Sequence, residues 1–275
     1  MKSTFEAAHE LPIVPAVNPT PAIDADQGTF MECYRGRQSW LHHAAYLRMG
    51  KVLLALRLGR EAGLDLSDKD ILDYGFGAGT FFRYCPPDSR LFGVEIDPQN
   101  VGAVREMLRE RGCENADLRT IEIEHWESHA LLGRQYDVIL CSHVLEHLPD
   151  PVGFMKRMRD CLTPSGVFMG LVPLNERIMD PHHVQRLDRA KIHAFNEAAG
   201  LRVQKYIEAD PWLYWFQPVF TRESGAVHTL AQGVSIALGL PATLLGADAW
   251  FALSKIYAAI SRSQPTQAAF LSARS

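Results

Sequence analysis

From residue 70 onward, short apolar runs alternate with longer segments in which apolar residues recur every three or four positions. A short apolar run bounded by turn residues is typical of a buried strand, and the three- and four-residue spacing is typical of an amphipathic helix. The pattern predicts strands at residues 71–74, 91–96, 118–123, 136–141, 166–172 and 201–207. It predicts helices between them, and another helix before the first strand, at residues 40–62.

Two of the predicted helices begin with the same pair of residues. Asp97 precedes Pro98, and Asp150 precedes Pro151. Aspartate accepts hydrogen bonds from the free N–H groups at a helix start, and proline suits the first helical position. Strands separated by helices form parallel βαβ units, so we expect an α/β fold, a three-layer αβα sandwich around a Rossmann-like sheet. Ligands of such folds bind beyond the carboxyl ends of the strands.

The ends of the chain differ from this middle part. Residues 1–36 are rich in proline and lack periodicity, which predicts an irregular arm before a helical cap at residues 37–67. Residues 225–247 contain no Asp, Glu, Lys or Arg, which is long enough to span a bilayer. Polar residues and glycines dilute this segment, so we expect helices that cover the core or lie on a membrane surface.

Composition narrows the class of protein. The 275 residues include 28 Lys and Arg against 32 Asp and Glu, a net charge of −4. Neutralisation of phosphates drives nucleic-acid binding, so this balance argues against a nucleic-acid partner. The five cysteines include no C-x-x-C pair, which argues against a zinc finger or a disulfide framework. Together with a first segment that does not resemble a secretory signal, this predicts a cytoplasmic protein.

A glycine-rich turn follows the first predicted strand, where Asp73, Gly75, Gly77 and Gly79 occupy alternate positions. Glycines let the backbone turn sharply and approach a ligand without a Cβ in the way. A helix that begins there would direct its N-terminus at an anionic group. Glu95 ends the second strand, 22 residues after Asp73, where a carboxylate can accept hydrogen bonds from both hydroxyls of a ribose. The turn therefore indicates a nucleoside cofactor.

A nicotinamide or flavin site is the rival interpretation, but its fingerprint has a glycine where this chain has Thr80. The fourth predicted strand decides between the two. Residues 136–151 read YDVILCSHVLEHLPDP and resemble the strand-four signature of class I S-adenosylmethionine-dependent methyltransferases, those of the ubiquinone-biosynthesis O-methyltransferase type above all. Residues 72–79, 162–166, 180–201 and 248–255 resemble further motifs of that family, in the same order.

The resemblance covers residues 68–255 and implies one methyltransferase domain with a seven-stranded, mostly parallel sheet. It implies that residues 248–255 form the last strand, which is antiparallel, and that an aromatic and apolar helical lid is inserted at about residues 210–247. Residues 256–275 would then be a C-terminal tail. The chain departs from the family pattern at Phe76 and Ser165, neither of which removes an expected cofactor contact.

The resemblance also implies a cofactor, S-adenosylmethionine, which leaves the reaction as S-adenosylhomocysteine. In this assignment the glycines pass close to the methionyl and ribose parts, Glu95 holds the ribose hydroxyls, and Glu124 or Glu122 faces the adenine. The implied cofactor-binding residues are Asp73, Gly75, Gly77, Gly79, Glu95, Ile96, Glu124, Trp126, Cys141 and His143.

The string His143-x-x-Glu146-His147 also matches the inverted zinc-protease pattern, whose spacing places the side chains on one helical face. A zinc-dependent hydrolase is therefore a lesser alternative. Related quinone O-methyltransferases hold a divalent ion with polar residues at this place, so metal-assisted methyl transfer is another. We favour a third interpretation, in which Glu146 and His147 brace the loop and hold no metal.

Methyl transfer is an in-line displacement, so the main task of the protein is alignment. An oxygen or nitrogen acceptor must lose a proton, and a histidine can take it. His143 and His183 are the candidate catalytic bases, because the turns after strands four and five overhang one crevice.

Aromatic residues cluster at 211–216, which favours a bulky apolar acceptor. We therefore expect O-methylation of a small aromatic or lipid-linked molecule, with residues 212–247 able to contact a membrane surface. A catalytically silent cofactor-binding subunit that regulates or scaffolds a partner is the alternative. The oligomeric state stays open.

Overall fold

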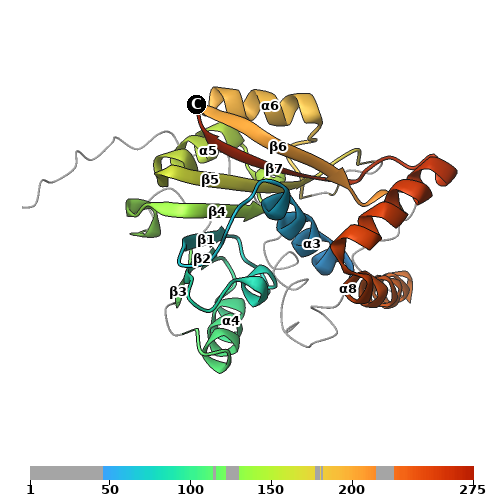
Figure 1. The fold of residues 1–275 in the computed structure, drawn as a ribbon, viewed down its shortest axis with the longest axis horizontal. Helices are drawn as coiled ribbons and strands as arrows, with labels where there is room; N and C mark the ends of the chain where they lie inside the picture. Colours follow the sequence, from blue (N-terminus) through green and yellow to red (C-terminus); the bar gives the residue numbers. More distant parts are fainter. Residues whose placement is uncertain (1–45, 114–115, 122–129, 177–179, 181, 215–225) are drawn as a thin grey trace, which may run out of the picture.

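The computed structural model describes residues 46–113, 116–121, 130–176, 180, 182–214 and 226–275 (Figure 1). At its centre is a seven-stranded sheet with the strand order β3-β2-β1-β4-β5-β7-β6. Strands β1 to β5 are parallel to one another, whereas β7 is antiparallel to both β5 and β6. The strands are β1 (Asp70–Tyr74), β2 (Arg90–Glu95), β3 (Ala116–Thr120), β4 (Tyr136–Ser142), β5 (Leu162–Pro173), β6 (Leu201–Ala209) and β7 (Gln267–Arg274). The predicted mostly parallel Rossmann-like sheet is confirmed.

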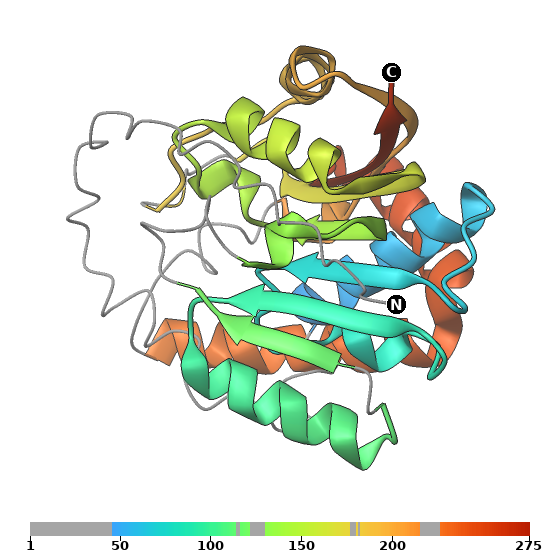
Figure 2. The same cartoon turned by 90° about the vertical axis from the view of Figure 1, so that its left-hand side faces the viewer.

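Helices cover both faces of the sheet (Figure 2): α3, α4 and α8 contribute to the core on one face, and α5 and α6 to the core on the other. Leu58 and Val104 are fully buried in the core under the first group, and Phe154 and Met158 are fully buried under the second. The three-layer sandwich therefore has one apolar core on each side of the sheet. The helices are α3 (Tyr46–Glu61), α4 (Pro98–Glu110), α5 (Pro151–Asp160), α6 (Arg189–Ala198) and α8 (Ala226–Ser261).

The predicted helix starts are confirmed in detail. The Asp97 carboxylate accepts a hydrogen bond from the N–H of Gln99, and that of Asp150 accepts one from the N–H of Gly153. Such a cap stabilises a helix by about 1 kcal/mol. These caps fix where α4 and α5 begin, and hence where the loops after β2 and β4 end.

The segment after the glycine turn differs from the expectation. It forms only a four-residue 3-10 helix, η1 (Phe81–Tyr84), so no α-helix N-terminus faces the turn. Phe81 and Phe82 are both buried in the core, and Cys85 adopts an extended conformation immediately before Pro86. A residue that precedes proline disfavours the helical conformation, which limits η1 to one turn. The helix N-terminus that the sequence led us to expect next to the glycine turn is therefore replaced by a single 3-10 turn.

The predicted position of the last strand is wrong. Residues 248–255 lie inside α8, where Trp250 and Phe251 are buried beside α3. The last strand is β7, which consists of residues expected in a C-terminal tail and pairs with β5 and β6 on its two sides. The sheet thus includes residues up to Arg274 and does not end at residue 255. The N-terminal arm at residues 1–36, and also Glu124 and Trp126, lie outside the described residues.

Candidate functional site

The glycine turn leaves β1 at its carboxyl end, next to the ends of β2 and β4, because Tyr74 pairs with residues of both strands. Gly75, Gly77 and Gly79 all have positive φ angles, of 75°, 53° and 65°. A Cβ on Gly75 would lie 2.7 Å from a methyl carbon of Val144, and one on Gly79 would lie 2.6 Å from a methyl carbon of Val104.

Gly77 differs from its two neighbours in the turn. A Cβ on Gly77 would meet no atom within 4 Å among the residues that the structure describes. The turn is therefore held by packing on both flanks and is open in its middle, where a ligand can approach the backbone.

The Glu95 carboxylate closes the turn from the end of β2. Its Oε2 accepts a hydrogen bond from the N–H of Gly77 at 2.6 Å, and its Oε1 accepts from the N–H groups of Ile96 and Asp97 at 2.9 and 3.2 Å. A carboxylate has about four acceptor positions, so about one is left for a ligand hydroxyl. Burial raises the pKa of Glu95, and the three backbone hydrogen bonds oppose this shift.

Asp73 is a second buried acid at this place, with only 3% of its surface exposed. Burial, followed by the nearby charge of Glu95, raises its pKa well above the usual value. Its Oδ1 has no hydrogen-bond partner among the described residues. A ligand with an ammonium or sulfonium group would supply the missing positive charge and a donor.

These observations fit S-adenosylmethionine, which carries an ammonium group, a sulfonium and a ribose. The open backbone at Gly77, the unpaired oxygen of Asp73 and the carboxylate of Glu95 supply the approach, the counter-charge and an acceptor. Cys141, near the end of β4, has its side chain fully buried in the core, so only its main chain could border a ligand. Ile96 is partly buried against the same core, directly after Glu95.

A cluster of histidines and acids lies beside the turn, in the loop that follows β4. His143 has a positive φ of 56°, and its N–H donates to the carbonyl of Leu171 at 2.8 Å. Its Nδ1 lies 3.1 Å from Oε1 of Glu146, whose side chain is fully buried. Glu146 lies in η4 (Leu145–His147), a three-residue 3-10 helix that begins two residues after His143. The α-helical face that a zinc-protease motif requires therefore does not form.

Burial shifts the pKa values of both members of this pair. It lowers the pKa of His143 to about 4, although the Glu146 charge opposes the shift. Burial acts to raise the pKa of Glu146, but the charge and hydrogen bond of His143 and the charge of His147 together lower it, and the net pKa is lowered. At neutral pH, a neutral His143 therefore faces an ionised Glu146. A histidine with so low a pKa is a weak proton acceptor.

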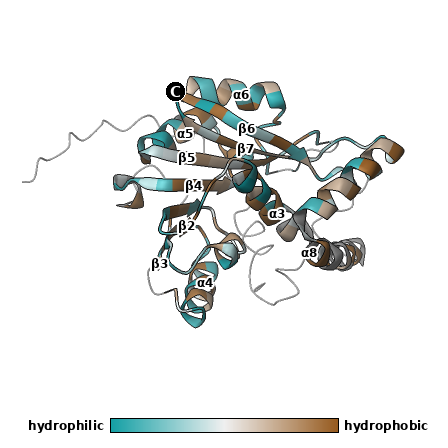
Figure 3. Cartoon of the chain, viewed as in Figure 1, coloured by the Kyte–Doolittle hydropathy of each residue, from teal (hydrophilic) through white to brown (hydrophobic). Residues whose placement is uncertain are grey.

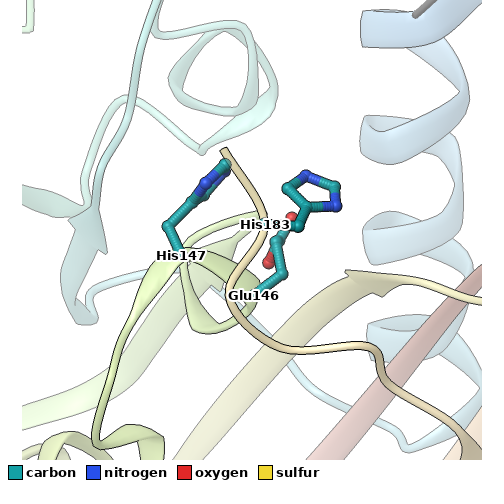
Figure 4. A group of neighbouring side chains, drawn as sticks. All are labelled: Glu146, His147 and His183. Atoms are coloured by element: carbon teal, nitrogen blue, oxygen red, sulfur yellow. The ribbon is translucent and has the colours of Figure 1, made fainter. Parts of the chain in front are cut away.

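His183 comes from the segment after β5 and lies over the same carboxylate. In Figure 4 the Glu146 side chain points toward the His183 ring, and His147 stands beside them. The backbone N–H groups of Val184 and Gln185 donate to the Glu146 carbonyl at 2.9 and 3.0 Å, which ties this segment to η4. The two predicted catalytic histidines, His143 and His183, are thus both brought next to one buried acid, Glu146.

Glu176 is a member of this cluster that the sequence analysis did not identify. Its Oε1 lies 2.7 Å from Nδ1 of His183, and only 4% of its side chain is exposed. Burial acts to lower the pKa of His183. The hydrogen bond that His183 donates to Glu176 and the charges of the nearby acids, Glu146 first among them, act to raise it, and the net pKa is raised. Glu176 follows β5 in no recognisable motif, so only the fold reveals it.

Three residues of the cluster could also hold a metal ion. Glu146, His147 and His183 each offer one ligand atom, and these atoms lie within 4.8 Å of one another. Nδ1 of His147 lies 3.0 Å from the carbonyl oxygen of His182, while Glu176 holds Nδ1 of His183. Such outer contacts orient metal-binding histidines. The alternative considered from the sequence named His143 in this group, but the structure places His183 there instead.

Comparisons with known proteins show the family and the fold of this chain. A family model described as a methyltransferase domain matches residues 41–218. The ubiquinone biosynthesis O-methyltransferase of Bordetella pertussis is 25% identical over 185 residues, which are 64% of this chain and 76% of that protein. The Histophilus somni protein of the same name is 30% identical over 105 residues. That match covers 37% of this chain and 44% of the relative, so the chain spans less than half of its length.

Solved structures show the same fold. Coclaurine N-methyltransferase bound to N-methylheliamine and S-adenosylhomocysteine superposes with a TM-score of 0.60 at 11% identity, over 89% of this chain and 79% of that one. A putative sarcosine dimethylglycine methyltransferase from Galdieria sulphuraria gives a TM-score of 0.54 at 16% identity, over 82% and 84%. The family match spans more than half of the chain, and it includes the glycine turn, Glu95 and the loop after β4. This chain therefore belongs to the class I S-adenosylmethionine-dependent methyltransferases, enzymes whose methyl donor is S-adenosylmethionine.

Proposed function

We propose that the enzyme methylates a hydroxyl oxygen of a bulky apolar small molecule, aromatic or lipid-linked. The observation that carries this proposal is the pair of Glu176 and His183 above the buried Glu146, beside the cofactor turn. When bound, S-adenosylmethionine supplies the methyl group. The curated relatives with O-methyltransferase names support oxygen as the attacked atom.

His183 is the base in this proposal. The Glu176 carboxylate accepts the proton on Nδ1, so the lone pair of the ring lies on Nε2. The two flanking carboxylates stabilise the imidazolium that forms when the acceptor hydroxyl loses its proton. His143, which is buried and has a lowered pKa, serves instead as the neutral partner of Glu146 at the methionyl end.

The test is transfer of a labelled methyl group to a cell extract, followed by mass spectrometry of the product. Once the acceptor is known, His183→Gln should lower kcat at least about a hundred-fold, the usual contribution of a general base. Affinity for S-adenosylhomocysteine should stay within about a factor of two, because His183 does not line the glycine turn. A label found on nitrogen or carbon, or full turnover by His183→Gln, would contradict the proposal.

Glu176 gives a second, independent measurement. In Glu176→Gln the amide can still accept from Nδ1 of His183, but it no longer stabilises the imidazolium. The acidic limb of the kcat profile should therefore move to lower pH, since the His183 pKa is raised in part by Glu176. A purely structural role for Glu176 would leave that limb in place. Glu197→Gln is the matched control, because Glu197 is an exposed residue of α6, and it should leave the acidic limb in place.

A second mechanism is favoured by the convergence of Glu146, His147 and His183. A divalent ion held by these residues would act as a Lewis acid and lower the pKa of an acceptor hydroxyl. Dialysis against a chelator distinguishes the two mechanisms. Activity that survives removal of metal supports His183 as the base, whereas activity that is lost and returns with one divalent ion supports the metal.

A further inference from the structure

The exposed large apolar side chains of this protein are concentrated on one helix. Of the nine in the described part of the chain, seven belong to α8, and the other two are Tyr84 and Val184. In Figure 3 most of the α8 ribbon is pale to brown, whereas α4 and α6 alternate with teal. The seven residues are Leu230, Val234, Leu244, Leu245, Leu253, Ile256 and Ile260.

These side chains form a stripe on each half of α8 rather than a random scatter. Before the kink, Leu230, Val234, Leu244 and Leu245 lie within an arc of roughly 100°, since each helical residue turns the chain by about 100°. Ser235 lies on the opposite side of this half and is buried. The first half of α8 therefore turns a polar residue inward and leucines outward.

The second half repeats this arrangement. Leu253, Ile256 and Ile260 follow one another at helical spacing and are 43%, 57% and 80% exposed. Trp250 and Ser254 lie on the other side and are buried. The two stripes meet at Gly246, whose φ of 76° kinks the helix. Leu244, next to this kink, is 86% exposed.

The charges along α8 point to the nature of the partner. The chain carries a net charge of −4, yet residues 226–262 contain Lys255 and Arg262 against a single acid, Asp248. Asp248 is paired with Arg60 of α3. An apolar stripe on a helix whose charged residues carry a net positive charge is typical of a helix that lies in the headgroup region of an anionic bilayer.

Two further observations favour lipid over a protein partner. The described outward residues of the first stripe carry no hydrogen-bonding side chain, although protein interfaces contain about one hydrogen bond per 100–200 Å². The stripes lie on a kinked helix at the side of the domain next to α3 (Figure 1), a projecting shape that a deformable bilayer can accommodate. Among the described residues, no helix is long and apolar enough to cross a membrane.

We propose that α8 is an interfacial anchor, whose outward stripes at residues 230–245 and 253–260 insert into the surface of an anionic lipid bilayer. Lys255 and Arg262 would lie at the headgroups. The proposed anchor thus includes part of residues 212–247, where the sequence led us to expect a membrane contact, and adds the second half of α8. This inference does not depend on which atom of the acceptor is methylated.

Vesicle flotation with the full chain tests the anchor. Vesicles of phosphatidylcholine with phosphatidylglycerol should carry the wild-type protein, and vesicles of phosphatidylcholine alone should carry at least several-fold less. The double variant Leu244→Ser, Ile260→Ser should lower binding at least about ten-fold, because two apolar side chains no longer insert. Val184→Ser, which changes an apolar residue that is 50% exposed and lies outside α8, is the control and should bind like wild type.

The outcomes separate this proposal from its rivals. Unchanged affinity for S-adenosylhomocysteine would show that the double variant is folded. Failure of the wild type to float with anionic vesicles, or an equal loss in Val184→Ser, would overturn the anchor. A wild-type dimer in light scattering that dissociates in the double variant, without vesicle binding, would assign the stripes to self-association and would also overturn it.

Discussion

Glu95 offers the sharpest test of the proposed cofactor site, because its carboxylate holds the turn and has an acceptor position left for a ligand. Glu95→Ala removes the acceptor of three backbone N–H groups, those of Gly77, Ile96 and Asp97. It also removes the position left for a ribose hydroxyl. We therefore expect two separate losses, one in stability and one in affinity for the cofactor.

The affinity loss can be worked from the bond count. A hydrogen bond to a charged acceptor contributes about 1.5–3 kcal/mol, and about one acceptor position of Glu95 is free for the ligand. The expected weakening is then roughly 10- to 150-fold, at about 1.4 kcal/mol for each factor of ten. Glu95→Gln should lose a similar amount, because its NH₂ group would face a backbone N–H that now donates to Oε2.

Isothermal titration with S-adenosylhomocysteine at neutral pH measures this loss, and urea unfolding of the same variants measures stability. Glu106→Gln is the matched control, since Glu106 is exposed on α4 and pairs only with Arg109 among the described residues. Its affinity should equal that of the wild type. If Glu95→Ala and Glu95→Gln both bound the ligand within a factor of two of wild type, the assignment of Glu95 to the ribose would be refuted.

Three further results are expected. Gly79→Ala should lower the free energy of unfolding by about 2–3 kcal/mol, because its Cβ would lie 2.6 Å from Val104 and its φ is positive, and Val104→Ala should restore part of this loss. Gly77→Ala, where a Cβ meets open space, should cost only about 1 kcal/mol in urea unfolding yet weaken binding of S-adenosylhomocysteine in titration. His143 has a pKa of about 4 in the fold against 6.5 when unfolded, so its contribution to stability is complete above pH 6.5 and is lost as the pH falls toward 4. Urea unfolding across this range should show a shallower decline in His143→Asn, which tolerates the positive φ, and parallel curves would contradict this account.

Local patterns determined most of the fold and the part of the candidate site formed by the glycine turn and Glu95. The strand–helix alternation, the caps at Asp97 and Asp150, the glycine turn and the acid at the end of β2 are all signals contained within a few neighbouring residues. Each acts through its own backbone conformation or through a hydrogen bond to a residue two or three positions away. For this reason they could be predicted without any knowledge of the tertiary structure.

The last strand and the histidine cluster were decided only by the tertiary structure. The apolar residues at 248–255 suit a strand or a buried helix equally well, and packing of Trp250 and Phe251 beside α3 selects the helix. The residues of β7 become a strand because β5 and β6 offer hydrogen-bonding edges on both sides. Likewise, His183 follows β5 and Glu146 follows β4, so His183 and its partner Glu176 are brought to Glu146 only because β4 and β5 end side by side. Such contacts join residues far apart in the chain, and no local pattern of polar and apolar positions encodes them.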